Sequence, residues 1–218
     1  MRPERARLSR RRLVLALLLG AMPLASHGQA LYDAFIRAVE TDDVDKLRGM
    51  LARGVDPNTV DPHGEPVLVV AARAGWEHTV DALLAAGAKV DAANGFGDRP
   101  IMVAALGGHL AIVQTLFRRG AALDAPGWTP LIYAATGGSI EVARFLLDAG
   151  AAIDAGSPNG TTALMMAVRE NHPEMVDLLM SRGADVNHRN REGATALAWA
   201  RRGGFVDIEA TLQRRGAR

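Results

Sequence analysis

The chain contains no cysteine and few aromatic residues. Among its 218 residues there are no Cys, three Trp, two Tyr and five Phe. Without cysteine there can be no disulfide, no thiol nucleophile and no lipid attached through an N-terminal cysteine. A domain of this size does not need disulfides, so their absence fits an oxidising compartment without requiring one.

Motifs that support catalysis are absent as well. The sequence has no His-Glu-x-x-His, no Gly-x-Ser-x-Gly and no phosphate-binding Gly-x-x-x-x-Gly-Lys. A nucleophile, a metal cluster and a phosphate cradle are therefore all missing. We expect a protein that is not an enzyme and that uses no cofactor and no small-molecule substrate.

Histidines and carboxylates are the remaining candidates for a metal site, and both fit turns better. His109 and His172 take equivalent places where helices begin, and His63 and His188 fall in turns with too few partners to hold a metal. A short polar residue recurs near the end of each unit, where such groups satisfy backbone donors. A row with one oxygen group per unit cannot converge on a calcium ion. This row consists of Asp56, Asp91, Asp124, Asp154 and Asn187.

Glycines punctuate the chain at almost even intervals. Gly64, Gly97, Gly127, Gly160 and Gly193 are separated by 33, 30, 33 and 33 residues. Each is followed by a short apolar stretch with alanines, and then by a segment whose apolar residues are spaced as in an amphipathic helix. A fixed period of this length predicts stacked units, which expose a long surface and rarely bury a catalytic pocket. Further glycines close the second segments, where a left-handed helix end favours them: Gly87, Gly120, Gly150 and Gly183.

These features resemble ankyrin repeats, a family with a 33-residue period and a Thr-Pro-Leu-His core. Thr129-Pro130-Leu131 matches that core best, and Thr162-Ala163-Leu164 matches it in part. The usual histidine is missing throughout, so the turns must be held in another way. In its place stand Val69, Met102, Ile132, Met165 and Ala198.

The resemblance implies an all-α fold, a solenoid of about six helix-turn-helix units with β-turn fingers between them. In the first unit we expect helices over 31–39 and 43–52, and the last unit is expected to end with a helix over 205–215. Six stacked units bury a continuous core that one unit alone could not. The repeat domain spans 31–218, with units at about 31–60, 61–93, 94–123, 124–156, 157–189 and 190–218.

One interval is three residues short. The segment before Gly127 is reduced relative to the segment before Gly97. Surface turns tolerate such shortening, so it can be a neutral variation. The alternative is a notch in the row of fingers, flanked by Phe96 and Trp128, that takes part in binding.

Residues 1–30 lie outside the repeat and resemble a secretory signal peptide. A head with six arginines and one acid, Glu4, precedes the apolar run Leu13 to Leu19, and small residues follow over 23–30. The apolar run is too short to span a membrane comfortably. Since the repeat register begins at Leu31, we expect cleavage directly before it, so that the protein meets the membrane only during export.

The export route stays open. Ser9-Arg10-Arg11-Arg12-Leu13-Val14 resembles a twin-arginine signal, which implies export after folding. Any basic head contains adjacent arginines, so general secretion is the other route. A third possibility is an uncleaved segment that anchors the protein to the inner membrane.

Removing the head changes the charge of the protein. The chain has 25 basic and 24 acidic residues, and residues 1–30 contain six of the basic and one of the acidic ones. Residues 31–218 therefore have 19 basic and 23 acidic residues, a net charge of −4. An acidic body gives no reason to expect nucleic acid as a partner. Arginines outnumber lysines there by seventeen to two, which hints at a GC-rich bacterial source. We therefore expect a periplasmic protein.

The resemblance also carries a binding surface onto this chain, because ankyrin repeats use a concave groove made by turn tips and first helices. The candidates at turn tips are His63, Glu65, Phe96, Asp98, Trp128, Asn159, Thr161, Arg191 and Glu192. Those at the ends of first helices are Arg73, Leu106, Thr136, Arg169 and Arg201. Phe96 and Trp128 are the expected hot spots, since exposed aromatics bury much surface at small entropic cost. Alternatively, Trp128 folds over the shortened turn and stabilises it.

Two functions follow from this surface. The first is a monomeric module that binds a protein partner of unknown identity through its concave face. The second is an immunity or inhibitor protein whose turn tips block the active site of a toxin. Tight one-to-one capture of a single toxic enzyme would distinguish the second from the first.

Overall fold

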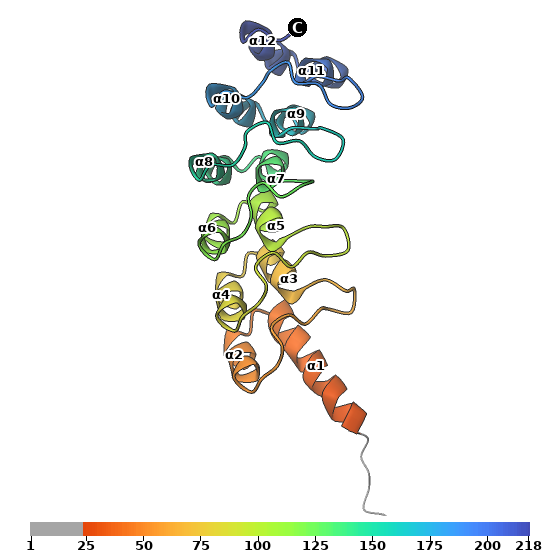
Figure 1. Ribbon diagram of the computed structural model, residues 1–218, viewed down its shortest axis with the longest axis vertical. Coiled ribbons are helices and arrows are strands. Elements are labelled where there is room, and N and C mark those ends of the chain that lie inside the picture. Colours follow the sequence, from red (N-terminus) through yellow and green to blue (C-terminus); the bar gives the residue numbers. More distant parts are fainter. Residues whose placement is uncertain (1–23) are drawn as a thin grey trace, which may run out of the picture.

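The computed structural model describes residues 24–218, and their side chains from Gly28 onward. This part of the chain forms twelve α-helices and no β-strand, arranged as an elongated stack (Figure 1). The all-α solenoid predicted from the repeat is confirmed. The proposed signal segment lies outside the described residues up to position 23, and its last residues belong to the first helix.

The helices alternate between two columns. First helices stack on one another, second helices do the same, and each first helix packs on the second helix of its own unit (Figure 1). The first helices are α1 (Leu24–Glu40), α3 (Val67–Ala74), α5 (Pro100–Leu106), α7 (Pro130–Gly137), α9 (Ala163–Arg169) and α11 (Ala196–Gly203). The second helices are α2 (Val44–Ala52), α4 (Glu77–Ala85), α6 (Leu110–Arg118), α8 (Ile140–Asp148), α10 (Pro173–Ser181) and α12 (Val206–Arg214).

Helix α1 is longer than expected. It begins at Leu24 instead of near Leu31, so the predicted cleavage position falls inside it. The helices expected over 43–52 and 205–215 are confirmed as α2 and α12. None of the helices between residues 24 and 218 is long and apolar enough to cross a membrane.

Threonine hydroxyls hold the start of three first helices in the absence of the family's histidine. The Oγ1 atoms of Thr129, Thr162 and Thr195 accept hydrogen bonds of 3.2–3.4 Å from the backbone N–H three residues further on. Each bond satisfies a donor that the first helical turn leaves free. The second helices end at glycines with positive φ, as the sequence predicted, at 94° for Gly87 and 91° for Gly120.

A ladder of side-chain bonds joins each unit to the next. Asp91, Asp124 and Asp154 accept from backbone N–H groups 28 to 31 residues further along the chain, at 3.0–3.3 Å. This confirms that the recurring polar row is turn chemistry. Asp56 also satisfies a backbone donor in its own turn, the N–H of Asn58, and in this unit it is Asn58 that accepts from the next unit.

Four β-turn fingers project beside the first helices (Figure 1). In each, two backbone hydrogen bonds of 2.7–3.0 Å close a five-residue turn. Neither bond forms in the described segment 122–129, which makes a narrow, short connection before α7. Asp124 still accepts its hydrogen bond from the next unit. The three residues missing from this interval therefore belong to the part that would form a finger. The fingers comprise residues 61–65, 94–98, 157–161 and 190–194.

Candidate functional site

The fingers and the C-terminal ends of the first helices lie on the same side of the stack, and we call this side the finger face. Equivalent positions, counted by the repeat, form two rows along it. The row on the fingers and the shortened turn consists of Glu65, Asp98, Trp128, Thr161 and Ala194. The row on the helix ends consists of Arg73, Leu106, Thr136, Arg169 and Arg202. Acidic groups therefore gather toward the N-terminal end of this face, and two arginines with no acidic residue at the equivalent finger position lie toward its C-terminal end.

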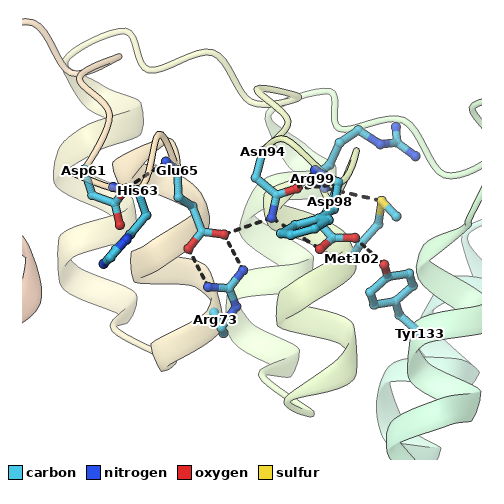
Figure 2. A network of polar contacts seen from close by, with 10 residues as sticks. Asp61, His63, Glu65, Arg73, Asn94, Asp98, Arg99, Met102 and Tyr133 are labelled. Carbon is cyan, nitrogen blue, oxygen red and sulfur yellow. Dashed lines mark hydrogen bonds and ion pairs between the residues drawn. The ribbon is translucent and has the colours of Figure 1, made fainter.

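A polar network crosses three units at the N-terminal end (Figure 2). The two terminal guanidinium nitrogens of Arg73, Nη1 and Nη2, donate to the carboxylate of Glu65, the first of them at 2.5 Å. Asn94 then donates through Nδ2 to Glu65 at 2.9 Å and to Asp98 at 3.3 Å. The hydroxyl of Tyr133, on α7, donates to the other carboxylate oxygen of Asp98. The network thus fixes two fingers against α3 and α7.

The network sets the charge of this end of the face. The hydrogen bond from Arg73 holds the pKa of the Glu65 carboxyl below its ordinary value, so Glu65 is ionised at neutral pH. Burial, together with the bond to Asp98, raises the pKa of Tyr133. Asp61, Glu65 and Asp98 line one hollow of about 540 Å³ between the first two fingers, with Arg73 as its only basic lining residue other than histidine among those described.

We expect Tyr133→Phe to lower the free energy of unfolding by about 1–2 kcal/mol at neutral pH, because Asp98 loses a donor. A raised pKa in the folded state means that the hydroxyl stabilises the fold below about pH 10. This contribution is lost as the pH rises toward the folded-state pKa. Urea unfolding at pH 7 and above pH 10 should therefore show the gap between the two proteins narrowing. A gap that stays constant with pH would contradict the role assigned to this hydroxyl.

The two aromatic side chains predicted as hot spots differ in exposure. Phe96, at the tip of the second finger, has 91% of its surface exposed, whereas Trp128 has 37%. The ring of Trp128 packs edge-on against Tyr133, with centroids 6.1 Å apart. Trp128 thus packs against a side chain of α7 and remains partly exposed.

A second hollow lies at the C-terminal end, with a volume of about 350 Å³. Trp199 of α11 and Phe205, which precedes α12, supply apolar walls. Arg169 and Arg202 are its basic lining residues, and Glu192 at the last finger is its acidic one.

The comparison with family models decides what this architecture is. The model of ankyrin repeats (3 copies) matches residues 35–126, 120–190 and 149–217. The chain belongs to the ankyrin-repeat family. A comparison with curated proteins found no match. Ankyrin repeats are protein–protein interaction modules that typically have no catalytic activity.

Most of the predicted site residues lie on the ankyrin finger face. His63, Asn159, Arg191 and Glu192 are exposed at finger tips, and Leu106 is exposed at the end of α5. Glu65, Asp98 and Thr136 are partly buried, and the first two are held by the network. Whether any of them contacts a partner stays a prediction.

Two predicted site residues need correction. Thr161 has only 1% of its surface exposed, because its finger packs against the next one, where Asn159 accepts from the N–H of Arg191. Arg201 turns toward α12 and donates to Glu209 at 2.8 Å. Its neighbour Arg202 lines the C-terminal hollow in its place.

Sequence reasoning missed two contributors that the ankyrin period could have shown. Arg202 lies 33 residues after Arg169, and Asn94 takes the same place in its finger as Asp61. The bond from Tyr133 to Asp98 joins residues 35 positions apart and carries no sequence pattern of its own.

The two equivalent histidines connect neighbouring ankyrin units. Nε2 of His109 lies 3.2 Å from the carbonyl oxygen of Arg73, and Nε2 of His172 lies 3.1 Å from that of Thr136. A carbonyl only accepts, so these nitrogens donate. Their predicted role as turn residues is confirmed. Among residues 24–218 there is no group of three or more His, Asp or Glu side chains arranged to hold a metal.

Proposed function

We propose that this ankyrin-repeat protein is exported to the bacterial periplasm and binds a protein partner there through its finger face, without chemistry of its own. The exposure of Phe96 carries the proposal. A phenylalanine ring with 91% of its surface exposed buries little apolar area in the fold, and it stands at the edge of a hollow lined by fixed polar groups. Aromatic anchors beside such hollows are typical of binding hot spots.

The surroundings of Phe96 favour a protein over a small molecule. The hollow is open, and the finger face continues from it toward α11, so the exposed surface is long and shallow. Small-molecule sites enclose most of their ligand, which this face does not. The network from Arg73 to Tyr133 holds two fingers in place before binding, which reduces the entropy lost in the complex.

The proposal of export depends on the first thirty residues. Their arginine head, apolar run and small-residue end follow the order of a secretory signal. Removal of this segment leaves an acidic body, which does not favour nucleic acid. Helix α1 begins within this segment, and its residues 28–30 are exposed, so the stack does not depend on their side chains.

The proposal is tested by crosslinking in the source bacterium. The full chain with a C-terminal tag is expressed, the periplasmic fraction is crosslinked, and captured proteins are identified by mass spectrometry. We expect one dominant partner, and a drop of about tenfold in its capture by Phe96→Ala. Phe117→Ala is the matched control, because Phe117 is an exposed phenylalanine on α6, in the column of second helices.

Other outcomes would contradict parts of the proposal. Equal capture by the wild type and Phe96→Ala would show that the tip of the second finger is not part of the binding site. Recovery of the tagged protein only from the cytoplasm would show that the protein is not exported. A partner that is a toxic enzyme, bound tightly at one to one, would make the protein an immunity factor.

A further inference from the structure

Three arginines occupy equivalent places at the ends of first helices, but only one of them has a carboxylate of its own. Arg73 pairs with Glu65, which lies eight residues before it. Thr161 lies eight residues before Arg169, and Ala194 lies eight residues before Arg202. Neither side chain can form the ion pair, because one is neutral and short and the other is a methyl group.

Two buried polar atoms show the same difference between the N-terminal and the C-terminal units. In the N-terminal part, Nδ2 of Asn94 donates to Glu65. The equivalent pair, Nδ2 of Asn190 and Oγ1 of Thr161, is buried, and neither atom has a hydrogen-bond partner among the described residues. The framework that surrounds a carboxylate in the N-terminal units is thus repeated without the carboxylate in the C-terminal units.

The two arginines are therefore available to a ligand. Within residues 24–218, Arg202 forms no hydrogen bond or ion pair, and Arg169 has only a loose contact of 3.6 Å with Glu170, its exposed sequence neighbour. Both line the C-terminal hollow beside Trp199 and Phe205. A guanidinium binds a carboxylate through paired N–H donors, and an aromatic wall adjoining it favours an apolar group.

We propose that the C-terminal hollow binds an extended segment of the protein partner that carries a carboxylate side chain next to an apolar one. This rests on the proposed function, since it places the partner on the finger face. A side chain of a passing segment fits better than a chain end, because the face continues from this hollow toward α3. The N-terminal hollow is lined by three acidic residues and one arginine, and the C-terminal hollow by two arginines and one acidic residue. We therefore expect the acidic part of the segment to lie at the C-terminal hollow.

The proposal is tested with defined peptides and the purified full chain, without knowledge of the partner. The probe is a fluorescein-labelled peptide with Glu-Phe-Glu between flanks of Gly and Ser, amidated at its C-terminus. The comparison peptides carry Gln-Phe-Gln, Glu-Ala-Glu or Lys-Phe-Lys, and one more Gln-Phe-Gln peptide has a free C-terminus. Fluorescence polarisation is expected to show binding of Glu-Phe-Glu about tenfold tighter than that of any of these.

Matched variants assign the binding to this hollow. The double variant Arg169→Gln and Arg202→Gln is expected to weaken binding of the Glu-Phe-Glu peptide by about tenfold or more. Arg144→Gln is the control and should change it by less than about twofold, since Arg144 is an exposed arginine of α8, in the column of second helices. Ala194→Glu restores a carboxylate eight residues before Arg202, so it should weaken binding while both arginines remain. Circular dichroism confirms that each variant is folded.

Several results would overturn this proposal and leave the proposed function standing. These are equal binding of the Gln-Phe-Gln and Glu-Phe-Glu peptides, an equal loss with Arg144→Gln, or no binding of any peptide. Preference for the peptide with a free C-terminus would mean that the hollow binds the carboxylate of a chain end instead of a side chain. That result would also overturn the proposal. Capture of a partner that depends on Phe96 tests the proposed function separately.

Discussion

Replacement of Leu116 by alanine is expected to lower the free energy of unfolding by about 3–4 kcal/mol. Leu116 lies in α6, in the middle of the stack, and its side chain has no exposed surface. The substitution removes three carbons from a site packed between α5 and the neighbouring second helices. The cost is the lost transfer free energy of these carbons together with the cavity that they leave.

Urea unfolding followed by circular dichroism at 222 nm measures this effect. Val206→Ala is the control, because Val206 lies on α12 with 73% of its surface exposed, and it should change stability by less than about 0.5 kcal/mol. A loss below about 1 kcal/mol for Leu116→Ala would mean that the middle unit is not packed as the structure shows.

The position of Leu116 makes the shape of the transition informative too. In a stack, each unit contacts only its neighbours, so stability is close to a sum of unit and interface contributions. Weakening a middle unit lowers the coupling between the two halves. We expect the unfolding transition of Leu116→Ala to broaden, with a smaller dependence of the free energy on urea.

The stack could be predicted from the sequence because its cause is local and repeated. Each glycine at a fixed interval supplies a positive φ, and each apolar segment supplies one helix face, so the pattern determines the units without knowledge of long-range contacts. The extent of α1 could not be predicted in this way. The register places a unit in the stack, but it does not limit how far a terminal helix extends beyond it.

The candidate site was predictable in its position and less so in its chemistry. The period locates every residue of the two rows on the finger face. It does not say that Asn94 would donate to Glu65, or that Tyr133 would reach Asp98, because these bonds join side chains 29 to 35 residues apart. Thr161 has the right register and is still buried, since its exposure depends on how closely the next finger packs.

The second large effect is expected from Gly137→Ala, which should lower the free energy of unfolding by about 2–3 kcal/mol. Gly137 ends α7, and a Cβ atom there would lie 2.1 Å from the backbone carbonyl oxygen of Leu106. The contact between α5 and α7 is the most extensive among the described helices. The clashing atom belongs to the backbone, so relief requires a shift of one helix against the other.

Gly49→Ala is the matched control, because Gly49 lies in α2 and a Cβ atom there would meet no atom within 4 Å. Alanine is favoured over glycine inside a helix by about 1 kcal/mol, so this variant should be slightly more stable than the wild type. Helix propensity favours alanine at both glycines. The two substitutions differ because α5 approaches Gly137 closely, whereas nothing approaches Gly49. Thermal and urea unfolding should therefore give changes of opposite sign, and stabilisation by both substitutions would show that α5 and α7 lie farther apart than this contact requires.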